Sequence, residues 1–296
     1  MSVAFARPGT LAELVSLLGG ELVRTDAGPA TVGRLAPIRE AKAGDLAPLL
    51  ASKYLAAAEE AHDRGACVLA SRALLVDARV RRIAAWSHEH ATWALAGLLD
   101  RCAVELPPAV VGEGCVLGEN VVLERGVVLG ARVRIGHNSV IGRPGFGWAT
   151  GPGGQVRAMP QHGGVIVEDD AVIGPLCSID AGTLSPTYVR RGAKLDAQCH
   201  VGHNCDIGEG CIVAAQSGFA GSVTLGCGVL VGGQVGVADH VVIGDGARIA
   251  AKSGVIGDVP AGAVVAGYPA VPRARWLRAL ARLYKGLNAT AGLEPA

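Results

Sequence analysis

Aromatic residues are scarce in this chain of 296 residues, which contains four Trp, four Tyr and three Phe. A core built on large aromatic side chains is therefore excluded, because small aliphatic residues must supply nearly all the buried apolar area. Glycine, by contrast, is abundant, with 43 residues, about twice the usual ~7%. These glycines lack the every-third-residue period of collagen, which excludes that class too. The composition predicts a narrow, regular packing of small side chains.

A large net charge is also missing. The chain has 27 basic and 26 acidic residues, for a formal charge of +1, so no overall field predicts a nucleic-acid or membrane-surface partner. The first ten residues lack the regions of a signal peptide. Residues 211–238 carry no charge, but their glycines, polar residues and six-residue period argue against a transmembrane helix. We expect no transmembrane segment.

A six-residue repeat organises most of the chain. An aliphatic residue, or Phe at one position, recurs every six positions from Val111 to Ile141, again from Val167, and without a break from Val189 to Val255. The fifth position of each unit is small or β-branched. Six residues fit one short strand plus a turn, which is the signature of a parallel β-helix built from hexapeptides. The sequence therefore predicts a β-solenoid whose coils contain three hexads, with the aliphatic first position inside.

The eight cysteines fit this repeat. Five of them occupy the small fifth position, where Cys acts as a small hydrophobe: Cys115, Cys177, Cys199, Cys205 and Cys211. The other three have no metal-ligand spacing. We expect reduced thiols, no metal site and a cytoplasmic location.

Three regions are predicted along the chain. Residues 1–105 lack the hexad and indicate an α/β domain, with a capping box at Thr10 and Glu13 opening a helix that runs through Leu18. Further helices are expected over 53–64 and 86–100, and strands near 31–35, 46–50 and 67–70. Residues 106–270 form the β-helix. Residues 271–296 form a basic amphipathic helix.

The repeat also predicts which side chains stack. His203 is third in its hexad, and Gly221 is third in a hexad 18 residues later, so they share an edge one rung of ~4.8 Å apart. His240 is expected on that edge roughly 10 Å from His203, two rungs further on. A histidine base beside a glycine backbone N–H suits acyl transfer, which needs proton removal and a donor for the oxyanion.

Several motifs point to one family. The chain contains Pro144-Gly-Phe-Gly, Pro160-Gln161, Ile179-Asp180-x-Gly182-x-Leu184 with Thr187, Asp196-x-Gln198-Cys199-x-x-x-His203-Asn204, Ala220-Gly221-Ser222, and His240 followed by Ile243-Gly-Asp. Together they resemble the UDP-3-O-(3-hydroxyacyl)glucosamine N-acyltransferases of lipid A biosynthesis, which are hexapeptide-repeat acyltransferases. Gly44-Asp45-Leu46 followed by Lys53-Tyr54 is similar to the uridine-nucleotide-binding domain of that family.

The resemblance implies a left-handed β-helix and a homotrimer with active sites between subunits. It implies transfer of an R-3-hydroxyacyl chain from the 4′-phosphopantetheine arm of acyl carrier protein to the 2-amino group of UDP-3-O-acylglucosamine, with no cofactor held by the enzyme. Carried over by position, His203 is the general base, the Gly221 N–H is the oxyanion donor, and His240 is a second active-site histidine. Tyr54 would stack on uracil, and Asp196 would support the groove.

Other candidate features lie outside these motifs or depart from them. Gln161 and His162, on the excursion between Ile141 and Val167, are candidate substrate-binding residues. The basic face of the C-terminal helix is either solvated or a dock for acyl carrier protein. Ala181 and Ala197 stand where the family has Arg and Asn.

These departures favour an alternative, an acetyl-CoA-dependent N-acetyltransferase acting on another nucleotide-linked amino sugar. Gly254 argues for a long acyl chain, because no side chain there shortens the slot. A further alternative on the same fold is a zinc lyase resembling γ-type carbonic anhydrase. It is disfavoured because it needs three convergent histidines, and only two are expected on one edge. A non-catalytic scaffold is disfavoured by the stack of His203 and Gly221.

Overall fold

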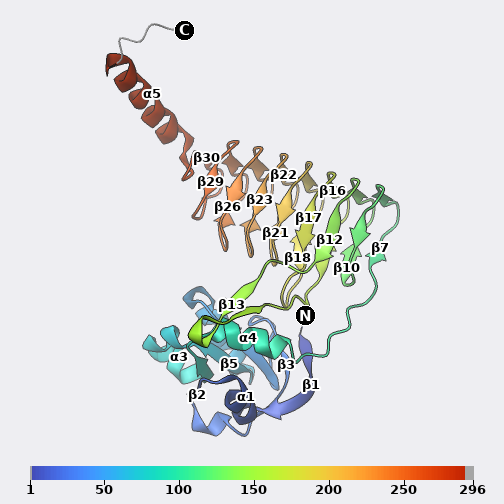
Figure 1. Cartoon of the computed structure of the whole chain (residues 1–296), viewed down its shortest axis with the longest axis vertical. Helices are drawn as coiled ribbons and strands as arrows, with labels where there is room; N and C mark the ends of the chain where they lie inside the picture. Colours follow the sequence, from blue (N-terminus) through green and yellow to red (C-terminus); the bar gives the residue numbers. More distant parts are fainter. Residues whose placement is uncertain (1, 291–296) are drawn as a thin grey trace. The chain divides into compact units, whose positions relative to one another are not determined.

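The chain forms two compact units. The computed structural model describes residues 2–290 (Figure 1). Unit 1 comprises Met1–Pro107, Pro144–Gly164 and Gly182–Pro186, and unit 2 comprises Pro108–Arg143, Val165–Ala181 and Thr187–Ala296. Residues 144–164 and 182–186, which the hexad analysis placed within the β-helix region, are thus part of unit 1.

Unit 1 is an α/β domain around a six-stranded sheet. The strand order is β1-β3-β4-β5-β6-β2, with parallel pairing from β3 to β6 and antiparallel pairing at both edges. The strands are β1 (Val3–Thr10), β2 (Glu21–Leu22), β3 (Thr31–Leu35), β4 (Asp45–Leu49), β5 (Cys67–Ser71) and β6 (Ala84–His88). The helices are α1 (Leu11–Leu18), α2 (Leu55–Asp63), α3 (Ala78–Ile83) and α4 (Ala91–Leu99), with 3₁₀ turns at Thr25–Ala27, Ser52–Tyr54, Arg72–Val76 and Pro152–Gly154.

Most predicted elements of unit 1 are confirmed. The Glu13 N–H donates to Thr10 Oγ1 at 3.3 Å and the Thr10 N–H donates to Glu13 Oε2 at 2.7 Å, which is the predicted capping box of α1. The helix predicted over 86–100 is wrong in its first part, because Trp86 ends up in strand β6. There Trp86 is fully buried and its indole N–H donates to Gly19 O at 3.0 Å. Pairing of β6 with strands on both sides outweighs its local helical pattern.

The excursion out of the hexad register has a definite structure. It forms a hairpin of β13 (Trp148–Thr150) and β14 (Val156–Ala158). This hairpin packs on α4, where the Arg157 guanidinium lies 4.0 Å from the centre of the Trp93 ring. Gly151 lies against the same ring, and a Cβ at that position would collide with it. These contacts explain why the excursion belongs to unit 1.

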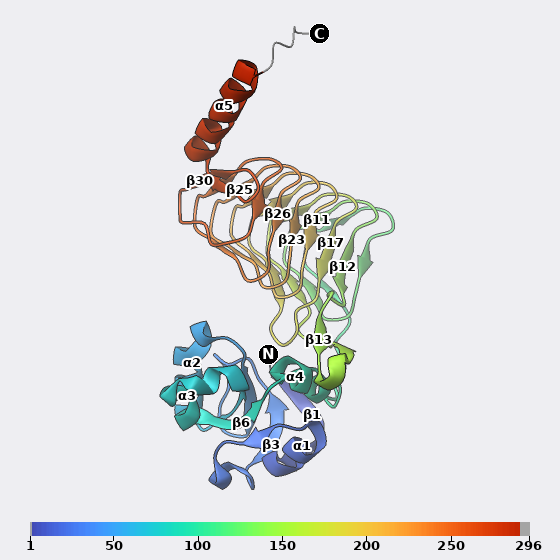
Figure 2. The same cartoon turned by 60° about the vertical axis from the view of Figure 1, so that its left-hand side comes forward.

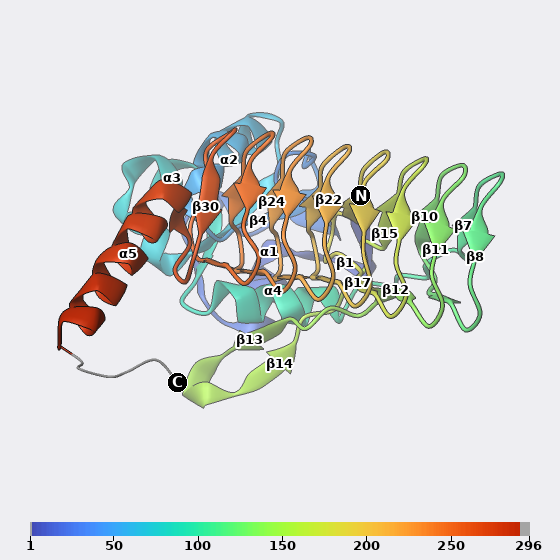
Figure 3. The same cartoon turned by 90° about the horizontal axis from the view of Figure 1, so that it is seen from above.

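Unit 2 is a parallel β-helix with three sheets, and its coils are seen stacked in Figures 2 and 3. The first sheet has the order β27-β24-β21-β18-β15-β10-β7. Its strands are β7 (Val110–Val111), β10 (Val127–Leu129), β15 (Val165–Val167), β18 (Thr187–Val189), β21 (Asp206–Ile207), β24 (Thr224–Leu225) and β27 (Val242–Ile243).

The second and third sheets complete each coil. The second contains β8 (Val116–Leu117), β11 (Arg134–Ile135), β16 (Val172–Ile173), β19 (Lys194–Leu195), β22 (Ile212–Val213), β25 (Leu230–Val231), β28 (Arg248–Ile249), β30 (Val264–Ala266) and β31 (Val271–Pro272). The third contains β9 (Val122–Leu123), β12 (Val140–Arg143), β17 (Ser178–Asp180), β20 (His200–Val201), β23 (Gly218–Phe219), β26 (Gly236–Val237) and β29 (Gly254–Val255). The predicted parallel β-helix is confirmed.

The solenoid interior follows the hexad. From Val127 on, the first and fifth positions are buried, and Phe219 fills its first position with no exposed surface. Val111 and Leu117, in the first coil, are 47% and 40% exposed because no coil precedes them. Helix α5 (Arg273–Thr290) follows the last strand. Trp276, in the first turn of α5, packs over Gly267. The predicted helical region extends beyond α5 into residues 291–296, which lie outside the described residues.

The cysteines occupy the interior positions that the hexad predicts. The Cys205 and Cys211 thiols are fully buried and donate to backbone oxygens of the next coil at 3.0 and 3.1 Å. Burial raises the pKa of Cys205 to about 12 and the pKa of Cys211 to about 11. Cys227, in contrast, is exposed.

These thiols should differ sharply in reactivity. At pH 8 we expect iodoacetamide to modify Cys227 quickly and Cys211 at least ~100-fold more slowly, because the thiolate is the nucleophile and a raised pKa depletes it. A time course read by peptide mass spectrometry measures both rates. Unfolding in guanidinium should abolish the difference, and equal rates in the native protein would contradict the interior placement.

Candidate active site

His203 and Gly221 meet at one corner of the solenoid. Val201 pairs with Phe219 across β20 and β23, so the residues two positions later, His203 and Gly221, stack as predicted. The His203 ring is half-buried and lies directly over Gly221. A Cβ at position 221 would be 2.5 Å from His203 Cε1 and 2.6 Å from Nε2. Only glycine leaves room for this ring.

The imidazole is oriented by its neighbour in sequence. Asn204 Oδ1 lies 3.2 Å from His203 Nδ1, and because an amide oxygen only accepts, Nδ1 carries the hydrogen. Nε2 then has the free lone pair, on the side of Gly221. The Gly221 N–H donates to no acceptor among the hydrogen bonds of the described residues. The corner therefore presents a base and a backbone donor side by side, which is what acyl transfer requires.

His240 lies at the same corner but one position off the predicted row. The register of β23 and β26 stacks Asp239 on Gly221, whereas His240 stacks on Ser222. The His240 N–H donates to Gly221 O at 3.0 Å, and its side chain is exposed. The prediction placed the hexad correctly but ignored that His240 is fourth and His203 third in their hexads.

Asp196 is at another corner. It follows β19 in the second sheet, whereas His203 follows β20 in the third. Asp196 is exposed and its Oδ1 accepts from the Ala197 N–H at 2.7 Å. Within one chain, the structure does not bring Asp196 and His203 to the same edge.

The remaining predicted residues lie in unit 1. Tyr54 is half-buried, with Lys53 Nζ 5.3 Å from its ring centre. Gln161 accepts from Thr183 Oγ1 at 2.9 Å and donates to Met159 O at 3.0 Å. His162 Nε2 lies 3.3 Å from Leu99 O. The contacts of Gln161 and His162 fasten the end of the excursion to neighbouring backbone and to Thr183.

Gly254 is not open, contrary to the prediction. The Tyr268 ring lies against it, in the space a side chain at 254 would need. An acyl slot running past Gly254 would therefore meet an aromatic ring, itself 83% exposed.

Asp180, part of the Ile179-Asp180-x-Gly182 motif, is a buried carboxylate that the hexad pattern alone does not predict. Asp180, at the end of β17, is 1% exposed, with Arg143 Nε at 2.9 Å and His200 Nε2 at 3.8 Å. Arg143 Nε also donates to Ser178 Oγ at 2.9 Å. A buried charge needs such partners. Its signal in the sequence was the aspartate directly after an aliphatic first position, Ile179.

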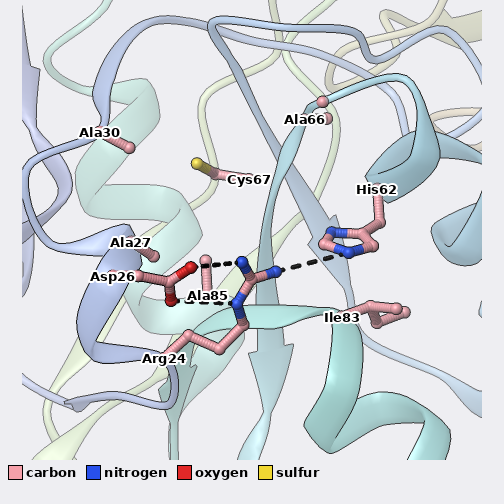
Figure 4. A pocket seen from close by; sticks show the side chains of 10 residues that line it. Arg24, Asp26, Ala27, Ala30, His62, Ala66, Cys67, Ile83 and Ala85 are labelled. Carbon is pink, nitrogen blue, oxygen red and sulfur yellow. Dashed lines mark hydrogen bonds and ion pairs between the residues drawn. The ribbon is translucent and has the colours of Figure 1, made fainter.

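Unit 1 also contains a cavity of about 220 Å³, shown in Figure 4. Arg24 spans it, bonded to Asp26 Oδ2 at 2.7 Å and facing His62 Nε2 at 3.4 Å. The arginine and aspartate charges cancel, and the rest of the lining is mostly small and apolar. Tyr54 does not line this cavity.

Among residues 2–290 no group of three or more His, Cys, Asp or Glu side chains is placed to hold a metal ion. None of the helices in this range is both long enough and apolar enough to span a membrane.

Comparison with known proteins agrees with the repeat. The model of the bacterial transferase hexapeptide family (six repeats) matches residues 103–143 and 186–221. These residues fall largely within the part of the chain in which the hexad repeats. The predicted fold class is confirmed as a parallel β-helix of hexapeptide repeats with an N-terminal α/β domain and a C-terminal helix.

The hexapeptide-repeat chain is similar to curated UDP-3-O-acylglucosamine N-acyltransferases, which confirms the predicted resemblance. It is 54% identical over 140 residues to one from Gloeobacter violaceus, covering 47% of this chain and 41% of the relative. It is 49% identical over 180 residues to one from Anaeromyxobacter sp., covering 59% and 51%. The chain thus spans about half the length of the relatives it matches, or less.

A solved structure, UDP-N-acetylglucosamine acyltransferase from Campylobacter jejuni, is 24% identical, with a TM-score of 0.45 over 56% of this chain and 70% of that one.

Proposed function

We propose that this chain transfers an R-3-hydroxyacyl group from acyl carrier protein to the 2-amino group of UDP-3-O-acylglucosamine, in lipid A biosynthesis. The observation that carries the proposal is the His203 ring over Gly221, with Nδ1 held by Asn204 and Nε2 free. The relatives named for this reaction supply the substrate class. The thioester on the 4′-phosphopantetheine arm is the donor, and the enzyme itself holds no cofactor.

The chemistry follows from the corner. The acceptor amine attacks the thioester carbonyl while His203 Nε2 removes a proton from the amine. The carbonyl oxygen becomes an oxyanion and takes a hydrogen bond from the Gly221 N–H. When the C–S bond breaks, the thiolate leaves and receives the proton from His203. An amide has formed, a thioester has been consumed, and His203 returns to its starting state.

We assign supporting roles to the other predicted residues. His240, at the same corner, contacts the donor arm, and Tyr54 stacks on the uracil of the acceptor. Gln161 and His162 complete the substrate contacts. Asp196 lies at a different corner from His203. In a homotrimer with active sites between subunits, Asp196 of one copy would line the groove that contains His203 of a neighbouring copy. The free thiols favour a reducing compartment, and we place the enzyme in the cytoplasm.

A second candidate keeps the fold and uses acetyl-CoA on another nucleotide-linked amino sugar. The observation that favours it is Tyr268, whose ring occupies the space beside Gly254 and would limit a long acyl chain.

A donor screen decides between the two. Purified full chain is incubated with UDP-3-O-acylglucosamine or with a UDP-linked amino sugar that carries no acyl chain, each with either 3-hydroxyacyl carrier proteins of increasing chain length or acetyl-CoA, and the amide product is followed by mass spectrometry. We expect product from a carrier-protein donor and none from acetyl-CoA. Activity with acetyl-CoA alone supports the second candidate, and no product from any donor refutes the proposed reaction.

A further inference from the structure

The turn that carries His203 is built differently from its neighbours. The corner residues Gln216, Ser222 and His240 have φ between 59° and 62°, and each donates its N–H to the backbone oxygen of the residue 19 positions earlier, at 2.8–3.0 Å. Asn204 has φ 61° as well. Its N–H, however, donates to the side-chain hydroxyl of Thr187 at 2.8 Å.

An interruption of the repeat accounts for this difference. Four extra residues lie between Ile179 and Val189, so β17 pairs with β20 at a spacing of 22 residues and the equivalent acceptor position for the Asn204 N–H is Ala181, 23 residues earlier. Ala181 is the last residue of unit 2 before the segment 182–186, which belongs to unit 1. At this corner the Asn204 N–H instead donates to the hydroxyl of Thr187, which is fully buried at the start of β18, directly after that segment.

This hydroxyl is linked to His203 through Asn204. A positive φ is an uncommon conformation for a residue with a side chain, so it persists where other contacts hold it. In that conformation the Asn204 amide oxygen reaches His203 Nδ1 at 3.2 Å. The partner of one ring nitrogen determines which nitrogen carries the hydrogen. The sequence of contacts runs from Thr187 through Asn204 to the imidazole.

We propose that Thr187 is a positioning residue: its hydroxyl holds the Asn204 backbone so that the Asn204 side chain selects the Nδ1–H form of His203. The kinetic consequence rests on the proposed function, because only there does His203 act as a base through Nε2. The structural consequence does not, since the tautomer exists without substrate.

The test compares Thr187→Val, which keeps the shape and removes the oxygen, with Thr187→Ser, which keeps the oxygen. Nitrogen NMR of histidine-labelled full chain at a pH where His203 is neutral reports which ring nitrogen is protonated. We expect hydrogen on Nδ1 in the wild type and in Thr187→Ser, and a shift toward Nε2–H in Thr187→Val. In the acyltransferase assay, kcat should fall about 10- to 100-fold in Thr187→Val with KM little changed.

Ser217→Ala is the matched control. Ser217 is also a buried solenoid hydroxyl, 1% exposed, and it accepts a backbone N–H, that of Val235, at 3.3 Å. This variant should lose stability while the His203 tautomer and kcat stay unchanged. If Thr187→Val likewise loses stability while the His203 tautomer and kcat stay unchanged, the role of Thr187 is purely structural and the proposal is overturned.

A second pair of variants covers the case in which Thr187→Val does not fold. Thr187→Ala leaves the corner without the acceptor, and Asn204→Gly removes the amide while keeping the positive φ without strain. Both should show the shift toward Nε2–H, and a wild-type tautomer in either overturns the proposal. If the wild-type protein is inactive with every donor, the proposed function is refuted but the role of Thr187 is not, because the NMR measurement tests that role without substrate.

Discussion

Replacing His203 with alanine is expected to lower kcat about 10²- to 10⁴-fold, the usual contribution of a positioned general base. The reason is geometric. The ring lies over Gly221, Asn204 occupies Nδ1, and Nε2 is left to accept the proton of the attacking amine. Steady-state kinetics with saturating carrier-protein donor measure the loss.

The chain offers a close control for this variant. His137 is also third in its hexad, after Ile135, and it is exposed with Nδ1 accepting from the Glu119 N–H at 2.8 Å. His137→Ala should keep wild-type kcat. A fully active His203→Ala would remove the central element of the proposed mechanism, because no other assigned histidine lies over Gly221.

Gly221→Ala is expected to lower kcat about 10²- to 10³-fold, close to the effect of losing an oxyanion donor. The added Cβ would be 2.5 Å from His203 Cε1, closer than real contacts allow, so the imidazole must move away. Gly221 has no positive φ, so the backbone tolerates alanine and the collision with the ring is the cause. Kinetics and a melting curve on the same preparation separate this effect from unfolding.

Two comparisons sharpen the result. In Gly257→Ala the new Cβ meets no atom within 4 Å, so this solenoid variant should stay fully active. The double variant with His203→Ala should be no slower than His203→Ala alone, because the collision disappears with the ring. Additive losses would contradict this explanation, because they would show that the added methyl group harms the site even when the His203 ring is absent.

The β-helix was predictable from sequence because its period is local. Each strand pairs with the strand one coil later, commonly 18 residues away, as Val201 does with Phe219. Counting along the chain therefore gave the correct rung for His203 and Gly221. The same counting misplaced His240 by one position, because His240 is fourth in its hexad and stacks on Ser222.

Features outside the repeat were not predictable in the same way. The hairpin of β13 and β14 owes its place to Arg157 stacking on Trp93, a contact between residues 64 positions apart. Trp86 entered a strand through pairing on both sides, against its local pattern. In each case distant partners decided the outcome, and a periodic pattern contains no information about them.

The sequence by itself determined the coil, its interior of small aliphatic residues and cysteines, and the stacking of His203 on Gly221, because backbone hydrogen bonds between coils repeat with the hexad. Only the tertiary structure decided how the imidazole is held. Four extra residues break the register before Thr187, and a buried hydroxyl there takes the place that a backbone carbonyl has at the other corners. That substitution depends on side-chain packing in three dimensions, which the period alone does not specify.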